Sequence, residues 1–151
     1  MNINKQLLDN LTAQAQASPR LRMNHDLRDS ADDQSQRMLN ALEPGTVLPI
    51  HRHRTTSETV VILRGRAVQY LYDDAGNETG QVLLAAGAGN PNVASLLGLP
   101  EDAVPGMQVE KGQWHRLESL ESGTVIVEMK DGAYVPIGEG DICEVSRRND
   151  V

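Results

Sequence analysis

Apolar side chains follow a helical spacing only in the first part of the chain. Between residues 4 and 17, Leu7, Leu8, Leu11 and Ala15 fall on one side of a helix. The pattern predicts a short amphipathic helix over residues 4–17, which ends at the following Ser-Pro pair. Because an isolated helix of this length is marginal in water, we expect its apolar side to pack on the rest of the protein or on a partner subunit.

Beyond residue 36 the spacing changes to short runs rich in valine, isoleucine and leucine, separated by turn residues. The predicted strands are Arg37–Leu42, Val47–His51, Thr59–Arg64, Arg66–Tyr72, Gln81–Ala85, Met107–Val109, His115–Ser119 and Thr124–Lys130. Many short strands with frequent turns are typical of an all-β sandwich or barrel. Phenylalanine is absent, so aliphatic side chains must fill the core.

Three segments show neither the helical spacing of apolar residues nor the short apolar runs typical of strands. Residues 20–36 are polar and are expected to be extended chain or loop. Residues 86–105 gather Gly, Pro and Asn around an apolar patch, and we expect a mobile loop near the mouth of the barrel with one helical turn at 94–97. An ordinary connection fits this segment equally well. Residues 131–151 are predicted to form an irregular tail.

Net charge and its distribution narrow the choice of partners. The chain of 151 residues fits one domain, and its net charge of −7 argues against a nucleic-acid surface. Residues 1–66 carry nine Lys/Arg and seven Asp/Glu, whereas residues 67–151 carry five and fourteen. The basic excess lies in the half that holds three of the four histidines. This asymmetry suits an anionic small molecule, or is ordinary surface variation.

The compartment is inferred from what the sequence lacks. The first ten residues do not show the basic start and apolar run of a signal peptide, and no stretch approaches the ~20 apolar residues that span a bilayer. Cys143 is the only cysteine, which excludes an internal disulfide. We therefore expect a cytoplasmic protein without a membrane partner.

The segment from Gly45 to Gly65 carries the candidate chemistry. His51 and His53 stand two apart, so on a strand both side chains leave the same face. Glu58 follows a short polar loop that can turn its carboxylate toward the same point. A carboxylate beside two neutral imidazoles is a good site for Fe, Mn, Zn or Ni. Taken alone, the histidine pair fits equally well with two solvated loop side chains.

His115 is a candidate fourth ligand from a separate strand. It follows Gly112, which allows a tight turn into that strand. The alternative is a histidine at the edge of the core that is hydrogen-bonded to the backbone. Trp114 before it should point to the opposite face, where packing is a more common role than stacking on a substrate.

These residues resemble the two sequence motifs of the cupin family. Gly45, His51, His53, Glu58 and Gly65 match the first motif in identity and spacing. In the second motif, the family's glycine and histidine are present, but a glutamate and a serine stand where proline and asparagine are usual. The resemblance implies a single-domain, all-β cupin fold, that is, a double-stranded β-helix or jelly-roll barrel.

The resemblance also implies which residues hold a metal. One divalent ion would be bound by His51, His53, Glu58 and His115. A cupin fold would also divide the chain into an N-terminal helix and arm (1–36), a cupin barrel (37–130) and a C-terminal tail (131–151).

A narrower resemblance extends over most of the chain. Gln36, Arg37, Asn40 and Pro44 make it similar to the WbuC-type cupin fold metalloproteins, small bacterial proteins often associated with O-antigen or lipopolysaccharide sugar gene clusters. This context favours carbohydrate chemistry. The expected function is a metal-dependent isomerase or dioxygenase acting on a small anionic or carbohydrate-related substrate. The alternative is a non-catalytic cupin that binds metal or sugar as a sensor or structural part.

Three further residues are weaker candidates. His25 lies in a basic segment and is an acid–base candidate, although a solvated loop histidine accounts for it more simply. Arg22 and Arg37 are candidate contacts for an anionic substrate.

We also expect a homodimer, because the run Arg66–Tyr72 has apolar or aromatic side chains on both faces. Cover of one face by the chain's own helix is the competing explanation.

Overall fold

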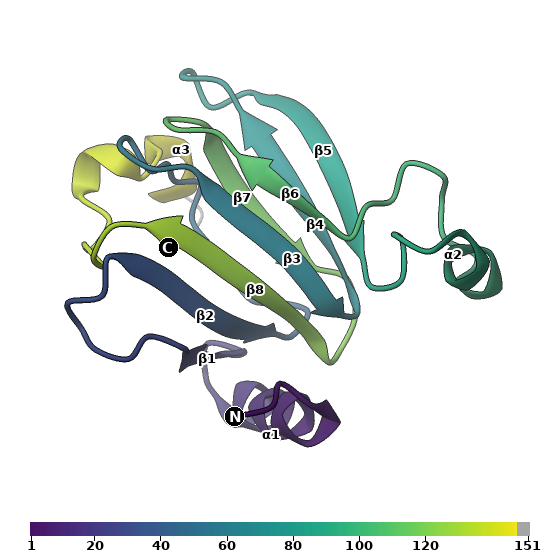
Figure 1. The fold of residues 1–151 in the computed structure, drawn as a ribbon. Helices are drawn as coiled ribbons and strands as arrows, with labels where there is room; N and C mark the ends of the chain where they lie inside the picture. The colour runs from purple at the N-terminus through teal and green to yellow at the C-terminus, as the bar shows by residue number, and fades with distance from the viewer. Residues whose placement is uncertain (148–151) are drawn as a thin grey trace.

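Two antiparallel sheets face each other in the computed structural model, which describes residues 1–147 (Figure 1). The five-stranded sheet has the order β1-β2-β8-β3-β6, and the three-stranded sheet has the order β5-β4-β7. The strands are β1 (Arg22–Asp26), β2 (Ser35–Leu42), β3 (Glu58–Arg64), β4 (Arg66–Tyr72), β5 (Glu78–Ala85), β6 (Gly106–Val109), β7 (Trp114–Ser119) and β8 (Thr124–Asp131). The expected all-β class is confirmed.

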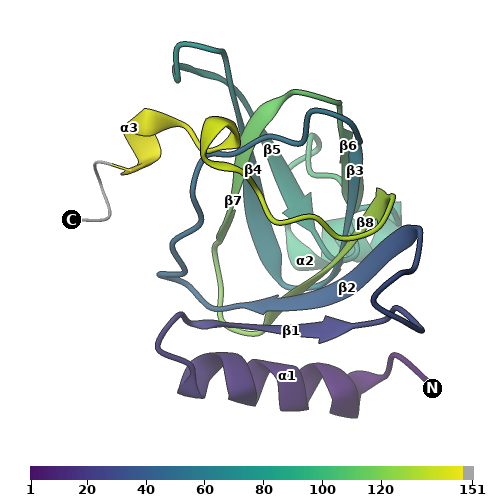
Figure 2. The same cartoon turned by 90° about the vertical axis from the view of Figure 1, so that its left-hand side faces the viewer.

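The predicted N-terminal helix is present as α1 (Lys5–Ala17). The side chain of Asn4 accepts a hydrogen bond from the backbone N–H of Leu7, which caps the start of the helix. Leu11 and Ala15 are buried, and the helix lies along the outer face of the five-stranded sheet (Figure 2). Its apolar side is therefore covered by its own chain.

The outer face of β2 and β8 forms one apolar layer with the helix. The buried members of this layer are Leu11, Ala15, Leu39, Ala41 and Val125. A second layer lies between the two sheets, and its buried members are Leu42, Val60, Ile62, Ala67, Leu84, Leu117 and Ile126. Both layers consist of aliphatic side chains, as the absence of phenylalanine requires.

Strand β1 makes the expectation for residues 20–36 more specific, since the sequence analysis expected extended chain or loop there and no paired strand. It pairs antiparallel with β2, with Met23 opposite Ala41. Met23 packs into the apolar layer under the helix. A five-residue edge strand with a single apolar side chain gives too weak an alternation to be recognised before its partner strand is known.

The segment between β5 and β6 contains a helix, α2 (Pro91–Leu97), where one helical turn was expected. It leaves the three-stranded sheet near Arg66, which pairs with Ala85, whereas Trp114 pairs with Tyr72 at the other end. The segment therefore lies at the end of the sheet opposite to His115.

The chain after β8 returns across the molecule instead of leaving it. It forms a 3-10 turn, η1 (Glu139–Asp141), and a short helix, α3 (Glu144–Arg147). Ile142 makes a β-bridge with His51, and the backbone N–H of Cys143 donates to the carbonyl of Ile50. The last four positions of the expected tail lie outside the described residues. None of the helices in residues 1–147 is long and apolar enough to cross a membrane.

Candidate metal centre

The three histidines of the motifs come together because two chain segments pair through their backbones. The N–H of His51 donates to the carbonyl of His115 over 3.0 Å, and the N–H of His115 donates back over 2.9 Å. The two imidazole rings lie 4.4 Å apart between centroids, and the ring of His53 lies 5.1 Å from that of His51. A backbone pair thus fixes the spacing of side chains that are 64 positions apart in the sequence.

Glu58 completes the group. It is the first residue of β3, its side chain points between the sheets, and it is 3 % exposed. One ligand atom from each of His51, His53, Glu58 and His115 can be chosen so that all lie within 4.8 Å of one another. Such a group could hold a metal ion.

Backbone carbonyls fix the tautomer of two of the imidazoles. His51 Nδ1 lies 3.0 Å from the carbonyl oxygen of Pro49, and His115 Nδ1 lies 2.8 Å from that of Gln113. Because a carbonyl oxygen only accepts, each Nδ1 must carry a proton, and in the neutral form of the ring Nε2 then offers a lone pair to a metal. This is the arrangement in which histidine binds a metal through Nε2 and donates its other N–H to a carbonyl.

Two of the imidazole nitrogens are buried without a hydrogen-bond partner among residues 1–147, namely His53 Nε2 and His115 Nε2. His53 Nε2 lies 3.1 Å from Glu58 Oε2, but this contact does not have the geometry of a hydrogen bond. A buried polar atom without a partner costs about 1–3 kcal/mol, and a bound cation would remove that cost. The residues present therefore fit a metal ion.

The charges of the group also suit a metal. Burial, reinforced by the neighbouring His115, lowers the pKa of His51 to about 4, so this imidazole is neutral at pH 7. Burial alone would raise the pKa of Glu58, but the facing His115 and His53 and the ammonium of Lys130 hold it well below its usual range. Neutral imidazoles beside one carboxylate anion form a typical donor set for a first-row divalent metal.

The inner face of β8 adds polar residues that the sequence analysis did not single out. Ile126, Glu128 and Lys130 alternate along this face, and Lys130 Nζ lies 3.0 Å from Glu58 Oε2. The side chain of Asn40, on β2, donates to the carboxylate of Glu128. The sequence did offer a sign of these residues: Glu128 and Lys130 continue the alternation of Ile126, so they fall on a buried strand face. Charged residues are uncommon at such positions unless they are paired.

A pocket opens beside the histidines. It has a volume of about 570 Å³ and lies between the segment 52–56 and the returning chain 130–141. Its lining includes His53, Lys130, Arg52 and Arg54. The two arginines are held by Asp141, whose Oδ1 lies 3.1 Å from Arg52 Nε and 2.5 Å from Arg54 Nε. The C-terminal segment is therefore part of the site's wall.

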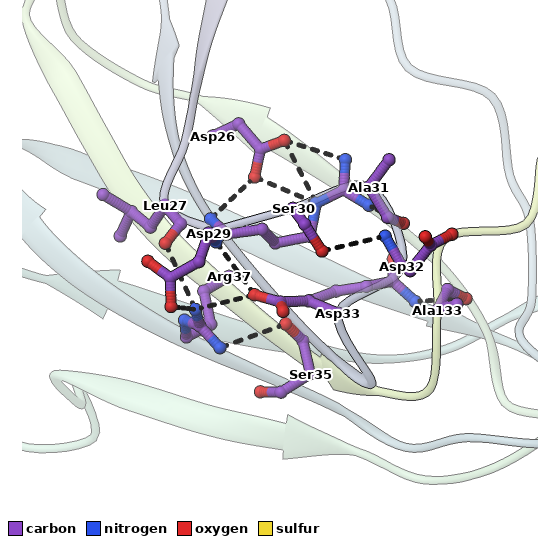
Figure 3. A network of polar contacts seen from close by, with 12 residues as sticks. Asp26, Leu27, Asp29, Ser30, Ala31, Asp32, Asp33, Ser35, Arg37 and Ala133 are labelled. Atoms are coloured by element: carbon purple, nitrogen blue, oxygen red, sulfur yellow. Dashed lines mark hydrogen bonds and ion pairs between the residues drawn. The ribbon is translucent and has the colours of Figure 1, made fainter.

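The structure does not bring His25 or Arg37 to this group. In the β1–β2 register His25 lies opposite Leu39, on the face that α1 covers. Arg37 instead holds the loop between β1 and β2, donating to the carbonyl of Leu27 and to Asp33 over 3.2 Å each (Figure 3). Those bonds occupy its guanidinium.

Arg22 takes a different position from these two. It lies opposite Leu42, whose side chain is part of the core between the sheets, and donates to the carbonyl of Val47 over 3.4 Å. The carboxylate of Glu128 acts on its pKa, although burial is the larger influence and lowers that pKa. Arg22 thus belongs to the inner side of the five-stranded sheet.

Comparison with solved structures identifies the fold as that of the cupins. The chain is similar to the capsular polysaccharide assembling protein CapF from Staphylococcus aureus (TM-score 0.58, 16% identity, covering 83% of this chain and 32% of that one). It is also similar to a mutant of Bacillus subtilis oxalate decarboxylase OxdC (TM-score 0.54, 14% identity, covering 82% of this chain and 28% of that one). A third similar structure is KdgF from Halomonas sp. (TM-score 0.53, 12% identity, covering 78% of this chain and 84% of that one). The chain thus spans about a third of the length of the first two proteins, and these identities show the fold alone.

The sequence places the chain within a particular family. Residues 3–84 match the model of the domain of unknown function DUF6016, and the chain belongs to that family. No curated protein matches it by sequence. The expected cupin fold is confirmed by the structural comparison, whereas the narrower likeness to WbuC-type proteins remains a prediction.

Proposed function

We propose that this chain binds one divalent metal ion through His51, His53, Glu58 and His115 and is an enzyme for a small anionic or carbohydrate-related substrate. The observation that carries the proposal is the pair of buried Nε2 atoms without partners, which face a buried carboxylate. Fe, Mn, Ni and Zn all accept such a donor set.

An ion held by four protein groups in octahedral geometry keeps two positions for water or substrate. When bound, it would act as a Lewis acid toward a carbonyl oxygen, as an isomerase needs, or, as Fe(II), support a dioxygenase reaction. The protein's own contribution is the pocket beside His53. Its lining includes three positive side chains, Arg52, Arg54 and Lys130, beside the two carboxylates of Asp131 and Asp141, and this small positive excess suits an anionic substrate.

Carbohydrate chemistry is the finer part of the proposal. CapF is described as assembling a capsular polysaccharide, and the sequence resembles proteins associated with lipopolysaccharide sugar clusters. Both likenesses point to a sugar or a sugar acid as the substrate, in lipopolysaccharide or O-antigen metabolism.

The metal assignment is tested by elemental analysis of protein purified without added metal. We expect about one divalent ion per chain in the wild type and loss of most of it in His51→Ala and His115→Ala, because each removes an inner ligand. His25→Ala is the matched control, since His25 lies on the opposite face of the sheet, and it should keep its metal. Full occupancy in His51→Ala would refute the site.

A second candidate is a non-catalytic metal-binding role. It is favoured by the number of protein ligands, because three imidazoles and one carboxylate can fill a tetrahedral ion completely. The visible spectrum of the Co²⁺-loaded protein separates the two roles. Weak absorption typical of five- or six-coordinate Co²⁺, which changes on adding a small anion, supports the enzyme, whereas intense tetrahedral absorption that no anion changes supports a structural site.

A further inference from the structure

A carboxyl group that the proposed metal site does not use lies on the same inner face as Glu58. Glu128 is in β8, opposite Val60 of β3 and Met38 of β2. Val60 is part of the core between the two sheets, so the carboxyl of Glu128 extends from this face into the interior. Glu58 and Glu128 are therefore neighbours on adjacent strands.

The position of this carboxyl is fixed by an amide. Asn40 Nδ2 donates to Glu128 Oε2, and Asn40 itself is only 8 % exposed. No other side chain or backbone group of residues 1–147 donates a hydrogen bond to the carboxylate of Glu128. One oxygen is thus held in place, while Oε1 is left to contact a ligand.

The charged and titratable groups that act on Glu128 come from four strands. They are Glu58 on β3, Lys130 on β8, His115 on β7 and Arg22 on β1. Burial and then the negative charge of Glu58 raise the pKa of Glu128 to about 7, against the opposing effects of Lys130, His115 and Asn40.

We propose that Glu128, held in position by Asn40, is the group that exchanges a proton with a ligand bound at the histidine cluster. This inference rests on the proposed metal site and makes it more specific. It favours a reaction that moves a proton, such as the isomerisation of a hydroxy ketone or keto acid, over a reaction with O₂. Asn40 acts through Glu128 and is a positioning residue.

The step balances without any redox partner. The carboxylate of Glu128 removes a proton from the carbon next to the substrate's carbonyl group, so that the C–H bond breaks and an O–H bond forms on Oε1. The electron pair moves to the carbonyl oxygen, which takes the proton of the hydroxyl group on the deprotonated carbon, and an enediolate forms. Return of the proton from Oε1 to the former carbonyl carbon leaves a carbonyl group on the former hydroxyl carbon, which yields the isomer and restores the carboxylate.

The test measures binding of azide to the Co²⁺-loaded protein from about pH 5.5 to about pH 8.5, a range of pH in which a buried carboxyl group can titrate. Azide keeps its charge over this range, and binding is followed by the visible absorption of the Co²⁺ ion. In the wild type, ionisation of Glu128 beside the anion should weaken binding by about tenfold more across the window than in Glu128→Gln. Glu118→Gln, a control on β7 whose side chain is 43 % exposed, should behave as the wild type does.

Metal content, measured on the same samples, keeps the two hypotheses apart. If Glu128→Gln holds its Co²⁺ and its pH profile coincides with that of the wild type, the role of Glu128 is refuted while the metal site stands. If the wild type takes up no Co²⁺, or azide never changes its spectrum, the proposed open site fails and this inference fails with it.

Asn40→Ser provides a second variant in case Glu128→Gln does not fold. It keeps Glu128 but removes the amide that donates to the carboxylate. Loss of that donor should move the midpoint of the azide pH profile upward, because the hydrogen bond favours the ionised carboxyl. A midpoint that stays where the wild type has it would contradict the proposal.

Discussion

The two faces of β2 and β8 serve different purposes although their residues alternate along the same strands. On the outer face, Leu39 and Val125 are fully buried against α1. On the inner face near the histidines, Asn40, Glu128 and Lys130 take the equivalent positions. One face is built from groups that gain free energy by leaving water, and the other from groups that lose it.

This difference indicates how the fold tolerates a polar interior. The helix-covered layer and the aliphatic layer at the far end of the sheets supply burial that offsets the desolvation of the charged groups. Substitutions on the outer face should therefore change the free energy of unfolding and leave the site's chemistry intact. Substitutions on the inner face should change the chemistry of the site and the dependence of stability on pH.

The largest effect on stability is expected on the outer face. Leu39→Ala removes a fully buried side chain beneath α1 and should lower the free energy of unfolding by about 2–5 kcal/mol, as measured by urea denaturation. Metal content per folded chain should not change. Leu63→Ala, at a position that is 37 % exposed, is the matched control and should cost much less. Equal losses in both variants would show that the helix-covered layer is not a tightly packed core.

Gly65→Ala tests the turn between β3 and β4, away from both faces. Gly65 has φ +84°, and an added Cβ would lie 2.8 Å from Thr124 Cα. Backbone strain and overlap should together cost about 2–4 kcal/mol by urea denaturation. Gly98 also has a positive φ but no neighbour within 4 Å of an added Cβ, so Gly98→Ala should cost only about 1 kcal/mol. If the two variants are equally stable, close packing at Gly65 is unimportant.

Glu128→Gln tests the inner face through pH. A carboxyl whose pKa is raised by folding, here to about 7 from 4.5, binds its proton more tightly in the folded state. Stability therefore falls as pH rises from the unfolded-state pKa through the folded-state pKa. In the metal-free protein, Glu128→Gln should gain up to about 3 kcal/mol relative to the wild type on going from about pH 4 to about pH 8, as measured by urea denaturation at each pH. Parallel pH curves for the two proteins would contradict the raised pKa.

The smallest effect is expected at a surface ion pair at the far end of the sheets. Arg66 Nη2 lies 2.9 Å from Glu121 Oε2, and both side chains are more than 40 % exposed. Arg66→Gln should change the free energy of unfolding by less than about 1 kcal/mol, and added salt should reduce the change further. A larger effect by urea denaturation would mean that this end contributes more stability than its burial indicates.

The sequence predicted the features that depend on short-range spacing. The helix over residues 4–17 and the strand class follow from the spacing of apolar residues. The four residues of the His/Glu group were expected from the resemblance to the cupin motifs, and the structure brings that group together. Strand β1 was missed because its pairing with β2 is what makes it a strand. Glu128 and Asn40 were missed because their contact joins residues 88 positions apart.

The expected homodimer stays a prediction. The structure places α1 on the five-stranded sheet, so the helix does not cover β4, and Tyr70 on that strand is only partly buried. Light scattering at micromolar concentration tests it, since a monomer has a mass near 16.5 kDa and a dimer about twice that.

The returning C-terminal segment has a consequence for synthesis on the ribosome. His51 and His53 are made early, but the backbone partner of His51 in β7 and its bridge to Ile142 come from the last third of the chain. Arg52 and Arg54 are likewise synthesised before Asp141, the residue with which both form ion pairs. In the nascent chain His51 and His53 therefore stay apart from His115 until β7 has emerged, and the walls of the candidate site are complete only after Asp141 and Ile142 have followed.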